Sequence, residues 1–167
     1  AAGVLRMVVV GTDLATSRSA FALCAGRTGL YPTAGIHPHD ARGADAATRE
    51  AIEGLCRRTE CVAVGETGLD FFKEYSPRAE QIESFRWHLG LAREIAKPVV
   101  VHCRAAHDET SELLREFQGV RGVMHCYTMG PDELAPYLEA GFYISFSGVV
   151  TYPRNAANRA PVSVPTA

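Results

Sequence analysis

Three short apolar runs are each followed, within two residues, by a side chain that can bind a metal ion. Glu66 follows the run at 61–64, His102 the run at 98–101 and His125 the run at 120–124. A carboxylate and two imidazoles from separate strands can converge on divalent cations, and this mixture suits zinc, manganese or magnesium. Two cations about 4 Å apart would polarise a phosphoryl group and activate a water molecule. The pattern predicts a hydrolytic metal site at these three residues, with Glu66 as the candidate catalytic residue.

Other polar side chains close to these strand ends are candidates for supporting roles. Arg104, two residues after His102, could donate in a forked geometry to a phosphate, or could pair with a neighbouring carboxylate, Glu66 or Asp70. Tyr127 follows His125 and could stack on a nucleobase. Asp70 could orient the loop that carries Glu66. We therefore expect Arg104 and Tyr127 to contact substrate and Asp70 to act behind the metal ligands.

Six apolar or β-branched runs recur along the chain, and each predicts a strand. Near-continuous apolar runs suit strands of a parallel sheet, which is covered on both faces. The runs are Arg6 to Val10, Leu30 to Ile36, Cys61 to Val64, Pro98 to Val101, Val120 to Met124 and Phe142 to Phe146.

Segments with helical spacing separate the runs, and the clearest extends from Ser76 to Ala96. Ser76 is the expected N-cap of this helix, followed by Pro77 at its first position. A second helix start is predicted at 130–133, with Leu134, Tyr137 and Leu138 facing inward. The weaker helical segments are Leu14 to Arg27, Asp45 to Thr59 and Asp108 to Gln118. His88 and His107 are expected to be solvent-facing or capping residues.

Alternating strands and helices predict an α/β fold, either an open sheet or a (β/α)8 barrel. Polar residues follow the carboxyl ends of many strands, which favours the barrel over an open sheet with one crevice. No glycine-rich nucleotide-binding motif occurs. The prediction is therefore a TIM barrel of the metal-dependent hydrolase type, represented by about six of its eight βα units. Residues 1–155 are expected to form this partial domain, and 156–167 an irregular, proline-containing tail.

The composition is that of an ordinary globular protein, with 17 Lys and Arg against 19 Asp and Glu, a net charge of −2. This balance excludes the basic field of a non-specific nucleic-acid binder, so a phosphate substrate would need metal ions to offset its charge. No run has the length of a transmembrane helix and no signal-peptide pattern occurs. We expect a cytoplasmic protein that does not bind membranes, whose five cysteines are reduced and mostly buried.

Five words in the sequence resemble, in order, those of the TatD family of metal-dependent deoxyribonucleases. The likeness runs from about Gly3 to Thr151. The words are Gly35-Ile36-His37-Pro38-His39, Gly65-Glu66-Thr67-Gly68-Leu69-Asp70 with Tyr75-Ser76-Pro77-Arg78 and Gln81, Lys97-Pro98-Val99-Val100-Val101-His102-Cys103-Arg104, Gly122-Val123-Met124-His125-Cys126-Tyr127, and Gly141-Phe142-Tyr143-Ile144-Ser145-Phe146-Ser147-Gly148.

The resemblance implies an amidohydrolase-type TIM barrel that hydrolyses DNA phosphodiesters, commonly as a 3′-5′ exonuclease. The family's metal-bridging glutamate falls on Glu66, and its two later histidine ligands fall on His102 and His125. By the same likeness His37 lines the substrate cleft, so it is a candidate substrate contact, whereas His39 is expected at the surface. The implied cofactors are divalent metal ions, two per complete site, and the implied partner is DNA, with no obligate protein partner.

Two words of the family pattern do not occur in the chain, and they leave alternatives open. A first-strand D-x-H-x-H word and an eighth-strand E-T-D word would supply further ligands, and their absence predicts a chain that is incomplete at both ends. One alternative is therefore a non-catalytic fragment or remnant. A second is a C–N hydrolase of the amidohydrolase type, because that superfamily shares the barrel and the ligand types.

Overall fold

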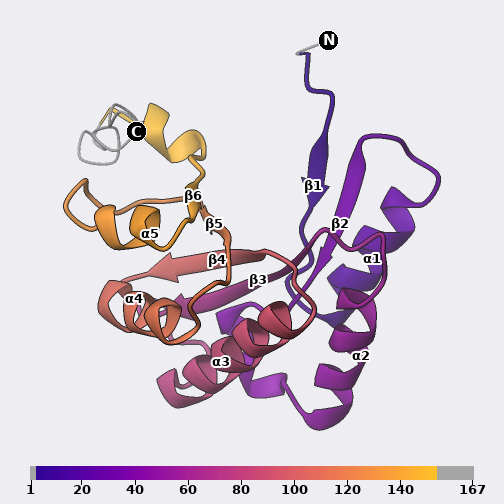
Figure 1. Ribbon diagram of the computed structural model, residues 1–167, viewed down its shortest axis with the longest axis horizontal. Helices are drawn as coiled ribbons and strands as arrows, with labels where there is room; N and C mark the ends of the chain where they lie inside the picture. The colour runs from indigo at the N-terminus through magenta and orange to yellow at the C-terminus, as the bar shows by residue number, and fades with distance from the viewer. Residues whose placement is uncertain (1–2, 154–167) are drawn as a thin grey trace.

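The computed structural model describes residues 3–153, and in this part of the chain six strands form one parallel sheet. The strands lie side by side in the order of the sequence, from β1 to β6 (Figure 1). A doubly wound open sheet reverses its strand order at a switch point, whereas a barrel adds each strand beside the previous one. The strands are β1 (Met7–Val9), β2 (Leu30–Ala34), β3 (Ala63–Asp70), β4 (Val99–Arg104), β5 (Gly122–His125) and β6 (Tyr143–Ile144).

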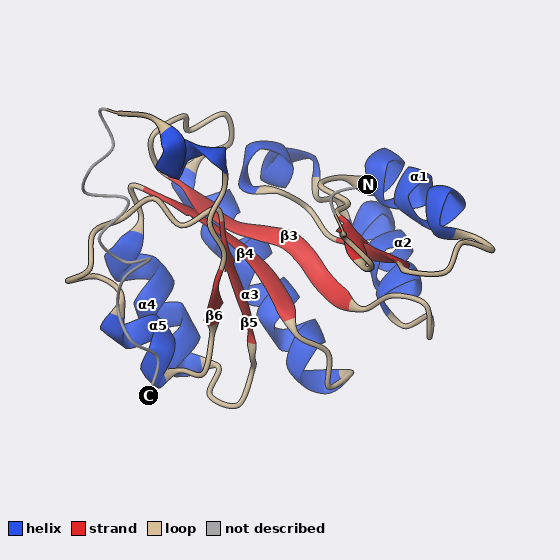
Figure 2. Ribbon diagram, turned by 90° about the horizontal axis from the view of Figure 1, so that it is seen from above, coloured by secondary structure: helices blue, strands red, loops and turns tan. Residues whose placement is uncertain are grey.

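Helices alternate with the strands and follow one another in an arc around the curled sheet (Figure 1). Figure 2 shows the strands together in the middle, with helices outside them. The α-helices are α1 (Leu14–Cys24), α2 (Ala46–Cys56), α3 (Arg78–Glu94), α4 (His107–Glu116) and α5 (Ala135–Glu139), and the 3-10 helices are η1 (Pro38–Gly43) and η2 (Gly148–Thr151). The architecture confirms the predicted partial TIM barrel. The predicted tail, 156–167, lies outside the described residues.

The core lies between the central strands and α3. All of β3 is buried, and Val99, Val100 and Val101 of β4 are buried in succession. This continuous burial is what the apolar runs predicted for parallel strands. Phe85 and Leu89 of α3 are fully buried in the same cluster. β3 and β4 are therefore a rigid base for the side chains at their carboxyl ends.

Two predicted helix starts are wrong. Ser76 is not the N-cap of α3, because its hydroxyl donates to the carbonyl of His39 and accepts the amide of Arg42, and so ties the β3–α3 loop to η1. The last helix begins at Ala135 rather than near Gly130, since the intervening residues form turns. Leu134 and Tyr137 are buried as predicted, but Leu138 is exposed.

Two composition-based predictions can be compared with the described residues. All five cysteines are free thiols and four of them are buried, as expected. None of the helices in 3–153 combines the length and apolarity that crossing a bilayer requires.

Candidate metal and substrate site

Glu66 lies at an irregularity of β3 that two glycines make possible. Val64 pairs with Val99 and Thr67 with Val101, so the bulged segment of β3 has one residue more than the facing part of β4. Gly65 and Gly68 have φ values of 126° and 134°. A Cβ at Gly68 would lie 2.0 Å from the carbonyl oxygen of His102, and one at Gly65 would lie 2.5 Å from that of Val100. The glycines of the G-E-T-G word therefore let β3 approach β4 closely on both sides of Glu66, within the strand.

Glu66 contacts both predicted histidine ligands. Its Oε1 is 2.9 Å from Nδ1 of His125 and 3.6 Å from Nδ1 of His102. His102 and His125 are paired in the register of β4 and β5, so the sheet places them side by side. Burial raises the pKa of Glu66, but contacts with the two histidines outweigh burial and hold it at about 2. The same contact raises the pKa of His125. The three residues predicted as metal ligands thus form one cluster around an ionised carboxylate.

Asp70, only 1% exposed, fixes the ring orientation of His102. Its Oδ2 lies 3.0 Å from Nε2 of His102 and 2.9 Å from Nε2 of His39. Burial raises the pKa of Asp70, but hydrogen bonds from the Lys73 amide and both imidazoles lower it overall. An ionised carboxylate only accepts hydrogen bonds, so Nε2 of His102 donates to Asp70, which leaves Nδ1, 3.6 Å from Glu66, as the nitrogen that a cation could bind. Asp70 therefore acts on His102, in addition to its expected part in the loop.

His37 lies against the same cluster but has a different tautomer. Ligand atoms of His37, Glu66 and His102 lie within 4.8 Å of one another. Nδ1 of His37 accepts the backbone amide of His39 at 3.2 Å. Burial lowers the pKa of His37 to about 4, with His102 acting in the same direction, so the ring is neutral near pH 7. The proton of the neutral ring is then on Nε2, so His37 can donate one hydrogen bond from that nitrogen.

The structure corrects three expectations about neighbouring residues. His39 is not a free surface residue, because it binds Asp70 and packs edge-on against His37. Tyr127 is 3% exposed and its hydroxyl donates to the carbonyl of Gly130, so its ring is in the core and cannot stack on a base. Arg104 forms no ion pair within the described residues; its guanidinium lies 4.0 Å from the ring centroid of Phe72, which is itself exposed.

The two helix histidines also differ from their predicted surroundings. His88 is fully buried, and its ring accepts the amide of Ile36 at 3.0 Å through Nε2 and donates to the carbonyl of Ser84 at 2.7 Å through Nδ1. His107 is half-buried, with Nδ1 2.9 Å from the hydroxyl of Tyr137. Neither is simply solvent-facing. His88 supports the residue that directly precedes His37.

Sequence reasoning also missed the hydrogen bonds that hold the backbone of Asp70, Glu66 and His37 in place. Gln81 of α3 is fully buried, accepts the amide of Asp70 at 2.8 Å and donates to the carbonyls of Asp70 and Ser76. Gly11 and Thr12 at the end of β1 accept the amides of Glu66 and His37, each at 2.7 Å. A buried glutamine early in a helix, after the Tyr75-Ser76-Pro77-Arg78 word, was the available signal for the first of these contacts.

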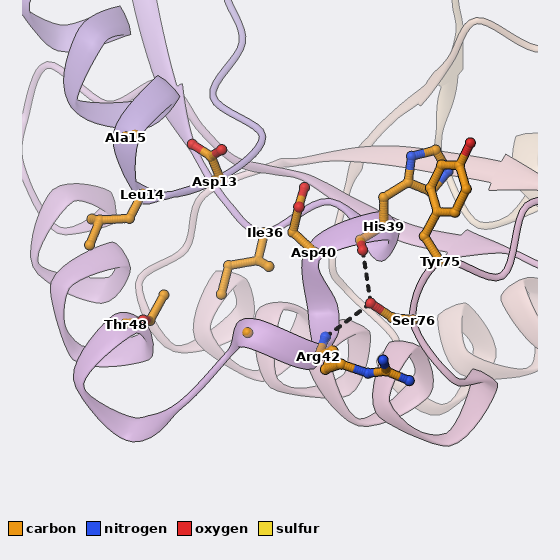
Figure 3. Close-up of a pocket in the computed structure, with 11 residues that line it drawn as sticks. Asp13, Leu14, Ala15, Ile36, His39, Asp40, Arg42, Thr48, Tyr75 and Ser76 are labelled. Carbon is orange, nitrogen blue, oxygen red and sulfur yellow. Dashed lines mark hydrogen bonds between the residues drawn. The ribbon is translucent and has the colours of Figure 1, made fainter.

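A cavity of about 530 Å³ opens beside His39, the partner of Asp70. Figure 3 shows His39 and Tyr75 next to each other at one edge of the cavity, and the two hydrogen bonds of Ser76 that join the loop to η1. Asp13 and Asp40 also line the cavity, and burial together with the charge of Asp13 raises the pKa of Asp40. The site therefore adjoins a hollow with room for part of a substrate.

The donor set fits a divalent cation. Glu66 supplies an ionised carboxylate, and His102 supplies an imidazole nitrogen. A second carboxylate, Asp70, binds the other nitrogen of that ring and orients it. Metal-binding histidines usually donate their other ring N–H to such a carboxylate. His37 differs from His102, because its Nδ1 accepts the His39 amide and the proton of its neutral ring is on Nε2.

Comparisons with known proteins place the chain in a family. The family model described as TatD related DNase matches residues 1–165. A protein of Klebsiella pneumoniae named 3′-5′ ssDNA/RNA exonuclease TatD is 41% identical over 152 residues, which are 90% of this chain and 58% of that protein. The Escherichia coli protein of the same name is 38% identical over 151 residues, which are 89% of this chain and 58% of that protein. This chain thus spans a little under three fifths of these relatives.

Solved structures with the same fold include two TatD proteins. The crystal structure of YJJV, a TatD homologue from Escherichia coli, superposes with a TM-score of 0.90 at 26% identity, covering 98% of this chain and 64% of that one. A TatD family hydrolase from Entamoeba histolytica gives a TM-score of 0.76 at 23% identity, covering 87% and 52%. The partial barrel described above is therefore the TatD fold.

Proposed function

Because the chain belongs to the family of TatD related DNases, we propose that it carries part of the active site of a metal-dependent phosphodiesterase that removes nucleotides from the 3′ ends of single-stranded DNA or RNA. The substrate and polarity come from the names of relatives that are longer than this chain. The observation that carries the proposal is the contact of one ionised carboxylate, Glu66, with histidines from two neighbouring strands.

Glu66, His102 and His125 would hold the cations, two in a complete site, and zinc, manganese and magnesium all suit these ligands. A bound cation would polarise the scissile phosphate and lower the pKa of an attacking water. Asp70 keeps the Nδ1 lone pair of His102 available, through the hydrogen bond at Nε2. His37, neutral and protonated at Nε2, can donate a hydrogen bond to a phosphate oxygen without repelling the cations.

The test is the release of nucleotides from a 5′-labelled single-stranded oligonucleotide, with and without Mn²⁺ or Mg²⁺. We expect the Glu66→Gln variant to lose divalent-dependent release by at least about a hundredfold, because it lacks the charged ligand. The Glu60→Gln variant is the matched control, since Glu60 is exposed and contacts its chain neighbours Arg58 and Thr59. Divalent-dependent release that survives in Glu66→Gln would contradict the proposal.

A further inference from the structure

An exposed group of aromatic and basic side chains lies beside the candidate metal site. Phe72 and Tyr75 are 62% and 61% exposed, although both belong to the short loop after buried β3. The Arg104 guanidinium stacks on Phe72, and Nζ of Lys73 lies 5.8 Å from the Phe72 ring and 5.9 Å from the Tyr75 ring. We call Phe72, Lys73, Tyr75 and Arg104 the aromatic platform.

The platform is held by the same residues as the site. Oδ1 of Asp70 accepts the amides of Phe72 at 3.1 Å and Lys73 at 2.9 Å, while Oδ2 of the same carboxylate binds His102. The Tyr75 ring lies 4.7 Å from that of His39, at the edge of the cavity (Figure 3). The backbone that carries the exposed rings is therefore held close to the candidate metal ligands.

The charges of the platform are not neutralised by the protein. Six arginines in the described residues pair with glutamates, namely Arg42, Arg49, Arg57, Arg58, Arg78 and Arg86. Arg104 and Lys73 form no such pair in that part of the chain. Exposed rings interleaved with free cations are the combination that binds single-stranded nucleic acid, because bases stack on the rings while phosphates meet the cations.

We propose that the aromatic platform binds unpaired bases of the substrate strand next to the cleavage site, with Arg104 and Lys73 on the adjoining phosphates. The inference rests on the proposed function for its substrate class. In a duplex both faces of a base are covered by its neighbours, so the platform would select single strands by requiring an uncovered face. Phe72 and Tyr75 would therefore stack on the bases, the role that the sequence analysis predicted for Tyr127.

The test measures binding without catalysis, in EDTA, by fluorescence anisotropy of labelled dT12 with the 167-residue chain. A second oligonucleotide of the same length carries abasic sites, so it retains the phosphates but offers no bases. We expect Phe72→Ala to weaken dT12 binding about tenfold, since stacking on one ring contributes of this order, and to change abasic binding less than twofold. Phe72→Trp should restore dT12 binding, whereas Arg104→Ala should weaken binding of both oligonucleotides.

Two exposed residues toward the opposite ends of the strands serve as matched controls: Tyr143, at the start of β6, and Arg121, which precedes β5. Tyr143→Ala and Arg121→Ala should each change binding less than twofold. The proposal is wrong if Phe72→Ala binds dT12 like Tyr143→Ala, if it weakens both oligonucleotides equally, or if the unaltered chain does not prefer dT12. Divalent-dependent cleavage is measured separately. If the chain cleaves but its binding does not depend on Phe72, only the aromatic platform is contradicted. If binding depends on Phe72 but the chain does not cleave, only the proposed function is contradicted.

Discussion

His88 and His102 are both held by two neighbouring groups, but the groups differ. His88 in α3 lies between a backbone amide and a backbone carbonyl and is fully buried. His102 in β4 lies between two carboxylates, and its side chain is 21% exposed. Backbone partners complete the hydrogen bonding of a neutral ring, whereas Asp70 holds Nε2 of His102 and leaves Nδ1, beside Glu66, for a cation. The same residue type is thus structural in one place and a candidate ligand in the other, and its partners make the difference.

The largest expected effect is on stability, from His88→Ala. The substitution leaves the buried amide of Ile36 without its partner and opens a cavity, so it should lower the free energy of unfolding by about 3 kcal/mol or more. Urea unfolding followed by circular dichroism measures this. Tyr143→Ala is the control, because that side chain is 79% exposed, and it should cost less than about 1 kcal/mol. Equal losses in the two variants would break the comparison.

The stability should also depend on pH through His88. Burial lowers its pKa from 6.5 to about 4 in the folded protein, so the unfolded chain binds more protons between these values. Stability is therefore retained above pH 6.5 and is lost as the pH falls toward 4, by about 3 kcal/mol for a shift of this size.

His37, whose pKa is lowered to a similar value, contributes to the same loss. The contribution of His88 is therefore the difference between the protein and its His88→Gln variant, measured by urea unfolding at several pH values. We expect the variant to lose distinctly less stability between pH 6.5 and 4.5. Parallel pH curves for the two proteins would show that His88 is not kept neutral by folding.

Asp70→Asn should sharpen the other half of the comparison. The asparagine amide would replace the charged acceptor of the His102 Nε2 proton by an N–H or a neutral oxygen. Replacing the hydrogen-bond partner of a metal-binding histidine lowers the metal affinity about ten- to a hundredfold. Calorimetric titration with Mn²⁺ measures this. Asp108→Asn, an exposed acid in the first turn of α4, should leave the affinity unchanged. An unchanged affinity in Asp70→Asn would mean that His102 needs no carboxylate to orient it.

The smallest effect is expected for His39→Ala. Asp70 keeps His102 and two backbone amides as partners when His39 is removed, so only one of its hydrogen bonds is lost. A single hydrogen bond contributes about 1 kcal/mol, which corresponds to roughly a fivefold loss of Mn²⁺ affinity. The same titration detects it. A loss as large as that of Asp70→Asn would instead give His39 a direct part in holding the cation.

The fold was largely predictable because its signals are local. The apolar runs predicted all six strands, although β3 continues to Asp70, six residues beyond its predicted end, and the polar residues after the runs indicated the carboxyl edge of a parallel barrel. Helix starts were less predictable. The hydroxyl of Ser76 can either cap α3 or bind η1, and in the folded protein it binds η1.

The sequence by itself determined the grouping of Glu66, His102 and His125, because parallel strands bring their carboxyl ends to one edge and the glycines beside Glu66 specify the bulge. Tertiary structure alone decided which aromatic residues are available to a ligand. Tyr127 follows β5, yet Tyr137 of α5 and Phe146 pack edge-on against its ring and help to bury it, whereas Phe72 follows β3 and remains exposed. The burial of an aromatic ring depends on elements that are distant in the sequence, so the local sequence pattern around the ring does not predict it.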